Sequence, residues 1–169
     1  WKVYARTDKL FIKRFEEERN LTVHILVDFS GSMGFTSHKM LKSTYAAQLA
    51  VGFAYLAMKN NERFVLSAFS KKLTSFRPRR GRGQLIGMFD MLKNRKAQGV
   101  AAFEAIITRY KSLINSKALV FIVSDFLYDL KEIESVLQKL NKQDVRLVQV
   151  LDPVEMDLNI EGDYRLEDL

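Results

Sequence analysis

The sequence contains no cysteine and only two prolines among its 169 residues. Without cysteine the chain forms neither disulfides nor thiolate metal sites, and this fits a reducing compartment, so we expect a cytoplasmic protein. No apolar run reaches the roughly 18 residues that a transmembrane helix needs, and no secretory leader is recognisable. The composition therefore favours a soluble globular domain.

The length and the hydrophobic content of 47% predict a single domain over residues 1–169. The chain starts at Trp1 rather than methionine and stops at Leu169 in a charged stretch, so we expect an excerpt of a longer protein. Membrane attachment through segments outside this chain stays an open alternative. The net charge of +7 favours acidic partners through long-range attraction, and solubility is the simpler explanation.

Strand-like apolar runs alternate with helical patterns along the chain. We predict strands over 21–29, 64–70, 73–76, 119–124 and 145–151, helices over 39–60, 84–92, 102–114 and 130–140, and an amino-terminal strand or arm within 1–20. In the longest helix, apolar residues at helical spacing predict a stripe facing the core: Leu41, Tyr45, Leu49, Phe53 and Leu56.

This alternation predicts an α/β fold, Rossmann-like, with a mainly parallel central sheet and helices on both faces. Only Lys71 and Lys72 separate two of the predicted strands, so we expect a hairpin and one antiparallel edge strand. Ligands of such sheets bind outside the carboxyl ends of the strands.

Asp28, Ser30 and Ser32 follow the first buried run at alternate positions, and Asp125 ends another predicted strand. Alternate residues of an extended segment point the same way, and adjacent parallel strands lie about 4.8 Å apart, so these oxygens are expected to converge. Hard oxygen donors suit Mg²⁺, Mn²⁺ or Ca²⁺. The simpler alternative makes the serines and Asp125 turn or helix-capping residues. His24, inside the buried run, is predicted to be a core histidine.

The Asp-x-Ser-x-Ser pattern after a buried strand, followed by a long helix and a strand ending in Asp, resembles a von Willebrand factor A domain. Further segments resemble one bacterial subgroup, the domain-of-unknown-function fifty-eight family, whose members are often encoded beside MoxR-type ATPases. These segments are 4–7, 9–10, 14–19, 21–23, 28–33, 151–155 and 162–169. The resemblance spans nearly the whole chain.

The resemblance implies that Asp28, Ser30, Ser32 and Asp125 form a metal-ion-dependent adhesion site, completed by an acidic side chain of a partner. The family pattern also has a threonine in the loop before a middle helix. Here Val100 follows Gly99, and no serine or threonine lies between Arg95 and Phe103. A missing ligand predicts weak Mg²⁺ binding, because Mg²⁺ then depends more on water.

We therefore predict a protein–protein interaction module rather than an enzyme. Its partner carries an exposed acidic residue, and by family analogy it is a MoxR-type ATPase or a client of one. A metal-free interaction domain with a degenerate site is one alternative. A Mg²⁺-dependent phosphohydrolase is a weaker one, because Ser30 stands where a second carboxylate is expected.

Two basic clusters bear on partners. The first lies in a turn containing glycine and proline: Arg77, Arg79, Arg80 and Arg82. No nucleic-acid module surrounds it, so we expect a solvated loop at the amino end of the sheet and no nucleic-acid partner. The second, Lys93, Arg95 and Lys96, is expected near the metal face.

Overall fold

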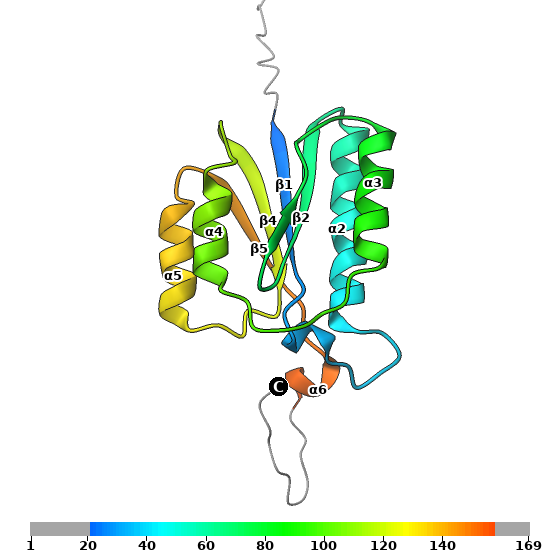
Figure 1. Cartoon of the computed structure of the whole chain (residues 1–169), viewed down its shortest axis with the longest axis vertical. Coiled ribbons are helices and arrows are strands. Elements are labelled where there is room, and N and C mark those ends of the chain that lie inside the picture. The colour runs from blue at the N-terminus through cyan, green and yellow to red at the C-terminus, as the bar shows by residue number, and fades with distance from the viewer. Residues whose placement is uncertain (1–20, 158–169) are drawn as a thin grey trace, which may run out of the picture.

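The computed structural model describes residues 21–157 (Figure 1), and the predicted amino-terminal arm and the segment 158–169 lie outside the described residues. The strands are β1 (Thr22–Asp28), β2 (Arg63–Phe69), β3 (Leu73–Ser75), β4 (Ala118–Ser124) and β5 (Asp144–Gln149). The helices are the 3₁₀ turn η1 (Ser32–Gly34), α2 (Lys42–Lys59), α3 (Arg82–Lys93), α4 (Phe103–Lys111), α5 (Leu130–Lys139) and α6 (Pro153–Met156). Each element predicted within residues 21–157 is present, with ends shifted by a few residues.

The strands form one sheet in the order β3-β2-β1-β4-β5. Strand β1 pairs in parallel with β2 and β4, and β4 with β5, whereas β3 pairs antiparallel with β2. All seven residues of β1 are buried, which suits a central strand covered on both faces. The predicted mainly parallel sheet with one antiparallel edge strand is confirmed.

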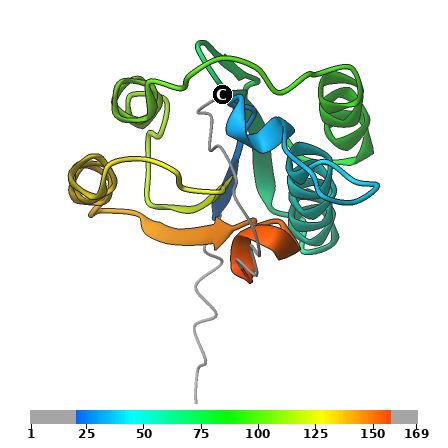
Figure 2. The ribbon, with the colours of Figure 1, turned by 90° about the horizontal axis from the view of Figure 1, so that it is seen from below.

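The helices cover the sheet in two layers, as the view from below shows: α2 and α3 lie on one face, and α4 and α5 on the other (Figure 2). Each layer encloses its own apolar core. Among residues 21–157, the chain has no helix whose length and apolarity would suffice to span a membrane.

The predicted core-facing stripe of α2 is wrong in part. Leu41 precedes the helix, and it is 40% exposed, while Tyr45 and Leu56 are 50% and 58% exposed. The fully buried face carries small residues instead: Ala46, Ala50, Ala54 and Ala57. Small side chains let the helix lie close against β1, so the larger residues of the apolar helix are left on its flanks. Periodicity alone does not distinguish the two faces.

His24 is a core histidine, as predicted. It is 3% exposed, and its Nδ1 lies 2.8 Å from the hydroxyl oxygen of Tyr110, whose ring meets the imidazole edge-on. Burial lowers the pKa of His24 from 6.5 to about 4, because the charged form loses its hydration.

We expect acid to destabilise the domain through His24. In the unfolded chain the imidazole binds a proton near pH 6.5, but in the fold it does so only near pH 4. Stability is therefore fully present above pH 6.5 and falls by roughly 3 kcal/mol as the pH drops to about 4. Urea unfolding across this range should show the loss. His24→Gln should flatten this part of the pH dependence, while His38→Gln, at an exposed position, should leave it unchanged.

Candidate functional site

Asp28 ends β1 and Asp125 directly follows β4, and the carboxyl ends of these two strands lie at the lower edge of the sheet in Figure 1. The register pairs Val27 of β1 with Val123 of β4, so Asp28 stands opposite Ser124 and Asp125 follows directly. The predicted convergence of two segments 97 residues apart follows from this parallel pairing.

Asp28 is a fully buried carboxylate held by several donors. Its Oδ1 accepts a hydrogen bond from the backbone N–H of Ser30 at 2.7 Å, and its Oδ2 accepts from Ser124 Oγ at 2.7 Å and from the Tyr128 hydroxyl. Burial raises the pKa of Asp28, and these hydrogen bonds oppose the rise. Asp28 therefore joins the ends of β1 and β4 to the segment before α5. Sequence reasoning missed Ser124 and Tyr128.

The two motif serines face each other, with Ser30 Oγ 3.1 Å from Ser32 Oγ. Neither caps η1 or α2, since Gly31 and Leu41 hold those positions without a side-chain cap. The helix-capping alternative for the serines therefore fails, and their hydroxyls remain paired in the turn.

Asp125 forms a buried ion pair with Lys42. Its Oδ2 lies 3.0 Å from Lys42 Nζ, and both side chains are almost fully excluded from solvent. The capping alternative fails here too, because Asp129 caps α5 through the N–H of Lys131. The next residue, Phe126, has a left-handed φ of 56° and turns the chain sharply after the strand.

Lys42 also forms an ion pair with a second carboxylate, that of Glu155, whose Oε1 lies 2.6 Å from Lys42 Nζ. Burial by itself lowers the pKa of Lys42, but hydrogen bonds and charges from Glu155 and Asp125 outweigh it, so the net pKa is raised. Lys42 was missed in the sequence. The sequence feature that could have identified it is its spacing: Lys42 lies four residues before Ala46 and so falls on the same buried helix face as Ala46 and Ala50.

Helix α2 begins at Lys42, not near residues 37–39 as the pattern predicted. Ser37 instead binds Asp152: its N–H donates to Oδ2 at 2.9 Å, and its hydroxyl donates to Oδ1. Asp152 and Glu155 also form a capping box at the start of α6. The short helix α6 is thereby fixed beside the site, as Figure 2 shows from below.

The loop before α4 crosses the motif loop. Gln98 N–H donates to Phe29 O at 2.9 Å, and Gly31 N–H donates to Gly99 O at 2.8 Å. Gly99 has a φ of 76°, which glycine adopts without strain. Val100 is 77% exposed and offers no side-chain oxygen where the family pattern has threonine.

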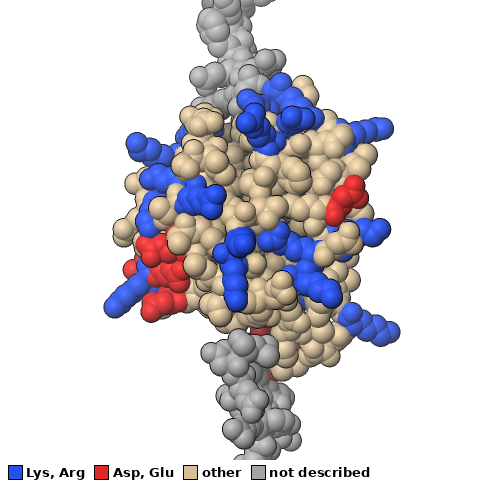
Figure 3. All heavy atoms as spheres, in the orientation of Figure 1, with Lys and Arg blue, Asp and Glu red and all other residues tan. Residues whose placement is uncertain are grey.

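The two basic clusters lie at opposite ends, as predicted. Arg79 bridges to Phe64 at the start of β2, which is the amino edge of the sheet. Lys93, Arg95 and Lys96 line a hollow together with Phe29, beside the motif loop. Basic side chains are spread over the face seen in Figure 3, whereas acidic ones gather mainly over α4 and α5.

The side chains predicted to hold a cation offer oxygen donors alone. Across residues 21–157 no three His, Cys, Asp or Glu side chains form a metal-binding group, so any ion there depends on the hydroxyls of Ser30 and Ser32. Asp28 accepts a hydrogen bond from the backbone N–H of Ser30, and Asp125 is paired with Lys42. Such an arrangement suits weak, water-rich coordination.

We expect Lys42→Met to destabilise the domain by about 3 kcal/mol or more, because it leaves the buried Asp125 carboxylate without its counter-charge. Urea unfolding at neutral pH measures this. The matched control is Lys139→Met, which removes a more exposed pair with Glu104 and should cost far less stability. Equal losses in the two variants would contradict this account of Lys42.

Comparison with known proteins agrees with this architecture. The family model "Protein of unknown function DUF58" matches residues 1–169. No curated protein sequence matches the chain. Three solved structures with the same fold are similar at low identity.

The conserved hypothetical protein BatB from Bacteroides thetaiotaomicron has a TM-score of 0.60 at 14% identity, covering 76% of this chain and 66% of that one. An aerotolerance-related membrane protein from Bacteroides fragilis has a TM-score of 0.63 at 15% identity, and the match covers 87% of this chain and 77% of that one. A von Willebrand factor type A protein from Catenulispora acidiphila has a TM-score of 0.57 at 13% identity, and the match covers 75% of this chain and 32% of that one. The fold is thus von Willebrand factor A-like, and this chain spans only part of each of these structures.

Proposed function

The chain belongs to the DUF58 family of proteins of unknown function, and from that premise we propose that it is a protein-interaction module which engages an acidic residue of its partner at the carboxyl edge of the sheet. The observation that carries the proposal is the joining of Asp28, Ser30 and Ser124 by hydrogen bonds across two adjacent strands. A protein-interaction role also accords with a von Willebrand factor A-like fold.

We assign Asp28, Ser30, Ser32 and Asp125 as the residues that would hold Mg²⁺, or Mn²⁺ or Ca²⁺ in its place. The bound ion would supply a positive centre that accepts one more anionic oxygen from outside the domain. The serine hydroxyls would provide ligand atoms, and Asp28 fixes the loop that carries them by accepting a hydrogen bond from the backbone N–H of Ser30. Exposed Val100 supplies no such atom, which supports weak binding.

A second candidate is metal-free docking at the same edge. The observation that favours it is the Lys42 ammonium group, which already pairs with both Asp125 and Glu155. In this form Lys42 supplies the positive charge at the site in place of an ion, and the partner's acidic groups meet the basic side chains around the edge. The two candidates differ in whether a chelator abolishes partner binding.

We propose binding rather than catalysis, because the position two residues after Asp28 is a serine and not the second carboxylate of a metal-dependent hydrolase. The finer proposals of a MoxR-type ATPase or its client as partner, and of a cytoplasmic location, rest on the family resemblance and on the cysteine-free sequence respectively.

We expect Mn²⁺ to bind with a dissociation constant on the order of 1 mM, since two hydroxyls and two shared carboxylates make a weak site. Calorimetry or Mn²⁺ relaxation measures it. The double variant Ser30→Ala/Ser32→Ala should lose binding, while Ser112→Ala/Ser116→Ala, remote from this edge, should keep it. Unchanged binding in the first double variant rejects the assigned ligands, and no binding to the native domain favours the metal-free form.

Restoring the family threonine should strengthen the site. Val100→Thr adds a hydroxyl to a loop already fixed to the motif loop through Gly99, so we expect Mn²⁺ affinity to rise about tenfold. Val100→Ala, which removes the valine without adding oxygen, is the matched control. An equal gain with alanine would show that bulk, and not a missing ligand, limits binding.

A further inference from the structure

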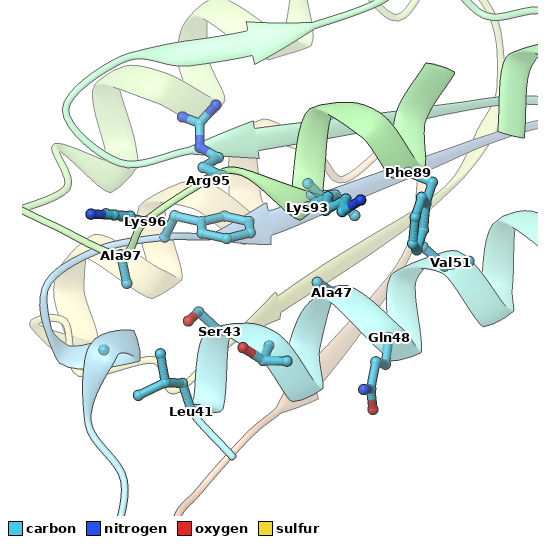
Figure 4. A pocket seen from close by; sticks show the side chains of 14 residues that line it. Leu41, Ser43, Ala47, Gln48, Val51, Phe89, Lys93, Arg95, Lys96 and Ala97 are labelled. Atoms are coloured by element: carbon cyan, nitrogen blue, oxygen red, sulfur yellow. The ribbon is translucent and has the colours of Figure 1, made fainter. Parts of the chain in front are cut away.

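A hollow of about 710 Å³ opens between α2, α3 and the segment that follows α3. Apolar side chains line much of it, among them Leu41, Ala47, Phe89 and Leu92. Leu41 and Phe89 are 40% and 51% exposed, so the hollow presents large hydrophobic groups to solvent. Figure 4 shows Ala47 and Val51 of α2 across from Phe89 of α3. Its volume lies within the range of sites that bind ligands or peptide side chains.

The hollow forms a groove along α2 and α3, and the charged side chains that line this groove are all basic. Lys93, Arg95 and Lys96 belong to its lining, and no acidic residue does. Arg95 is fixed in place, because its Nη1 donates to Thr74 Oγ1 at 2.9 Å and its guanidinium lies 5.5 Å from the Phe29 ring centroid. Figure 4 shows Lys93 at the end of α3 and Lys96 and Arg95 on the segment that follows it, with Arg95 pointing away from α2. An apolar floor with a basic rim complements a segment that is both apolar and acidic.

The groove is continuous with the candidate metal site. Phe29 and Gly34, from the loop that carries Ser30 and Ser32, both line it. Gln98 also binds Phe29 O, so the segment after α3 connects the basic rim directly to the motif loop. A partner bound in the groove would therefore reach the carboxyl edge of the sheet.

We propose that this groove binds an amphipathic helical segment of a partner protein, with large apolar side chains between α2 and α3 and Asp or Glu side chains on Lys93 and Lys96. The proposal deepens the interaction function proposed above and rests on it for the nature of the partner. Two flanking helices with apolar residues between them form the kind of groove that accepts a helix through apolar residues spaced three and four apart.

The test uses random 16-residue peptides displayed on phage and selected against the chain, followed by anisotropy measurements on the selected peptides. We expect the selected peptides to combine apolar residues at helical spacing with Asp or Glu. Thr44→Glu, at an exposed groove position, and Lys93→Glu/Lys96→Glu should each weaken binding at least about tenfold in low salt. Lys111→Glu/Lys117→Glu, with the same change in net charge at exposed positions away from the groove, should leave it unchanged. Circular dichroism confirms that each variant is folded.

The outcomes separate this proposal from the metal site. Groove-dependent binding that persists in chelator supports the groove and rejects the metal-bridged form. Binding that needs Mg²⁺ but ignores the groove variants overturns the groove and supports the metal. Selected peptides without acidic residues, or no selected peptides at all, overturn the groove. Saturable binding of dodecanoate that the groove variants abolish, without peptide binding, overturns it in favour of a small amphipathic anion.

Discussion

The buried ammonium group of Lys42 is the interaction on which the functional edge depends. It joins the first turn of α2 to Asp125 at the end of β4 and to Glu155 in α6. A buried carboxylate costs several kcal/mol unless a counter-charge accompanies it, so these three elements form one electrostatic unit. The lysine also reaches the site only because the alanine face of α2 lets the helix lie close to β1.

A second polar unit lies beside it, around Asp28. There the donors are neutral: a backbone N–H, the Ser124 hydroxyl and the Tyr128 hydroxyl. The two aspartates thus sit at the same edge in different electrostatic states, one hydrogen-bonded and one ion-paired. This difference matters for any incoming cation, which would find oriented hydroxyls near Asp28 and a competing internal cation at Asp125.

The edge also joins two kinds of surface. The polar site is compact and mostly buried, whereas the neighbouring groove is apolar with a basic rim. Small polar sites give specificity with little contact area, and apolar grooves give area with less specificity. Phe29, which follows Asp28 and lines the groove, connects the two surfaces.

Much of the architecture was readable from the sequence. Apolar runs alternating with helical patterns determined a mainly parallel sheet, and the two-residue link after Ser70 determined the antiparallel edge strand. The spacing of Asp28, Ser30 and Ser32 after a buried strand pointed to the carboxyl edge of the sheet as the candidate site, because strand ends in such sheets are ligand-binding positions.

Which face of α2 is buried was decided by the tertiary structure alone. The spacing of the leucine and tyrosine residues predicted a face that is partly exposed, whereas the alanines pack against the sheet. The tertiary structure also decided the partners of each charge. Lys42 and Glu155 are 113 residues apart, and Ser124 and Asp28 are 96 apart, so no local pattern joins them. Such contacts arise only when the sheet aligns its strands, because the pairing register and the helix approach are set by packing across the whole domain.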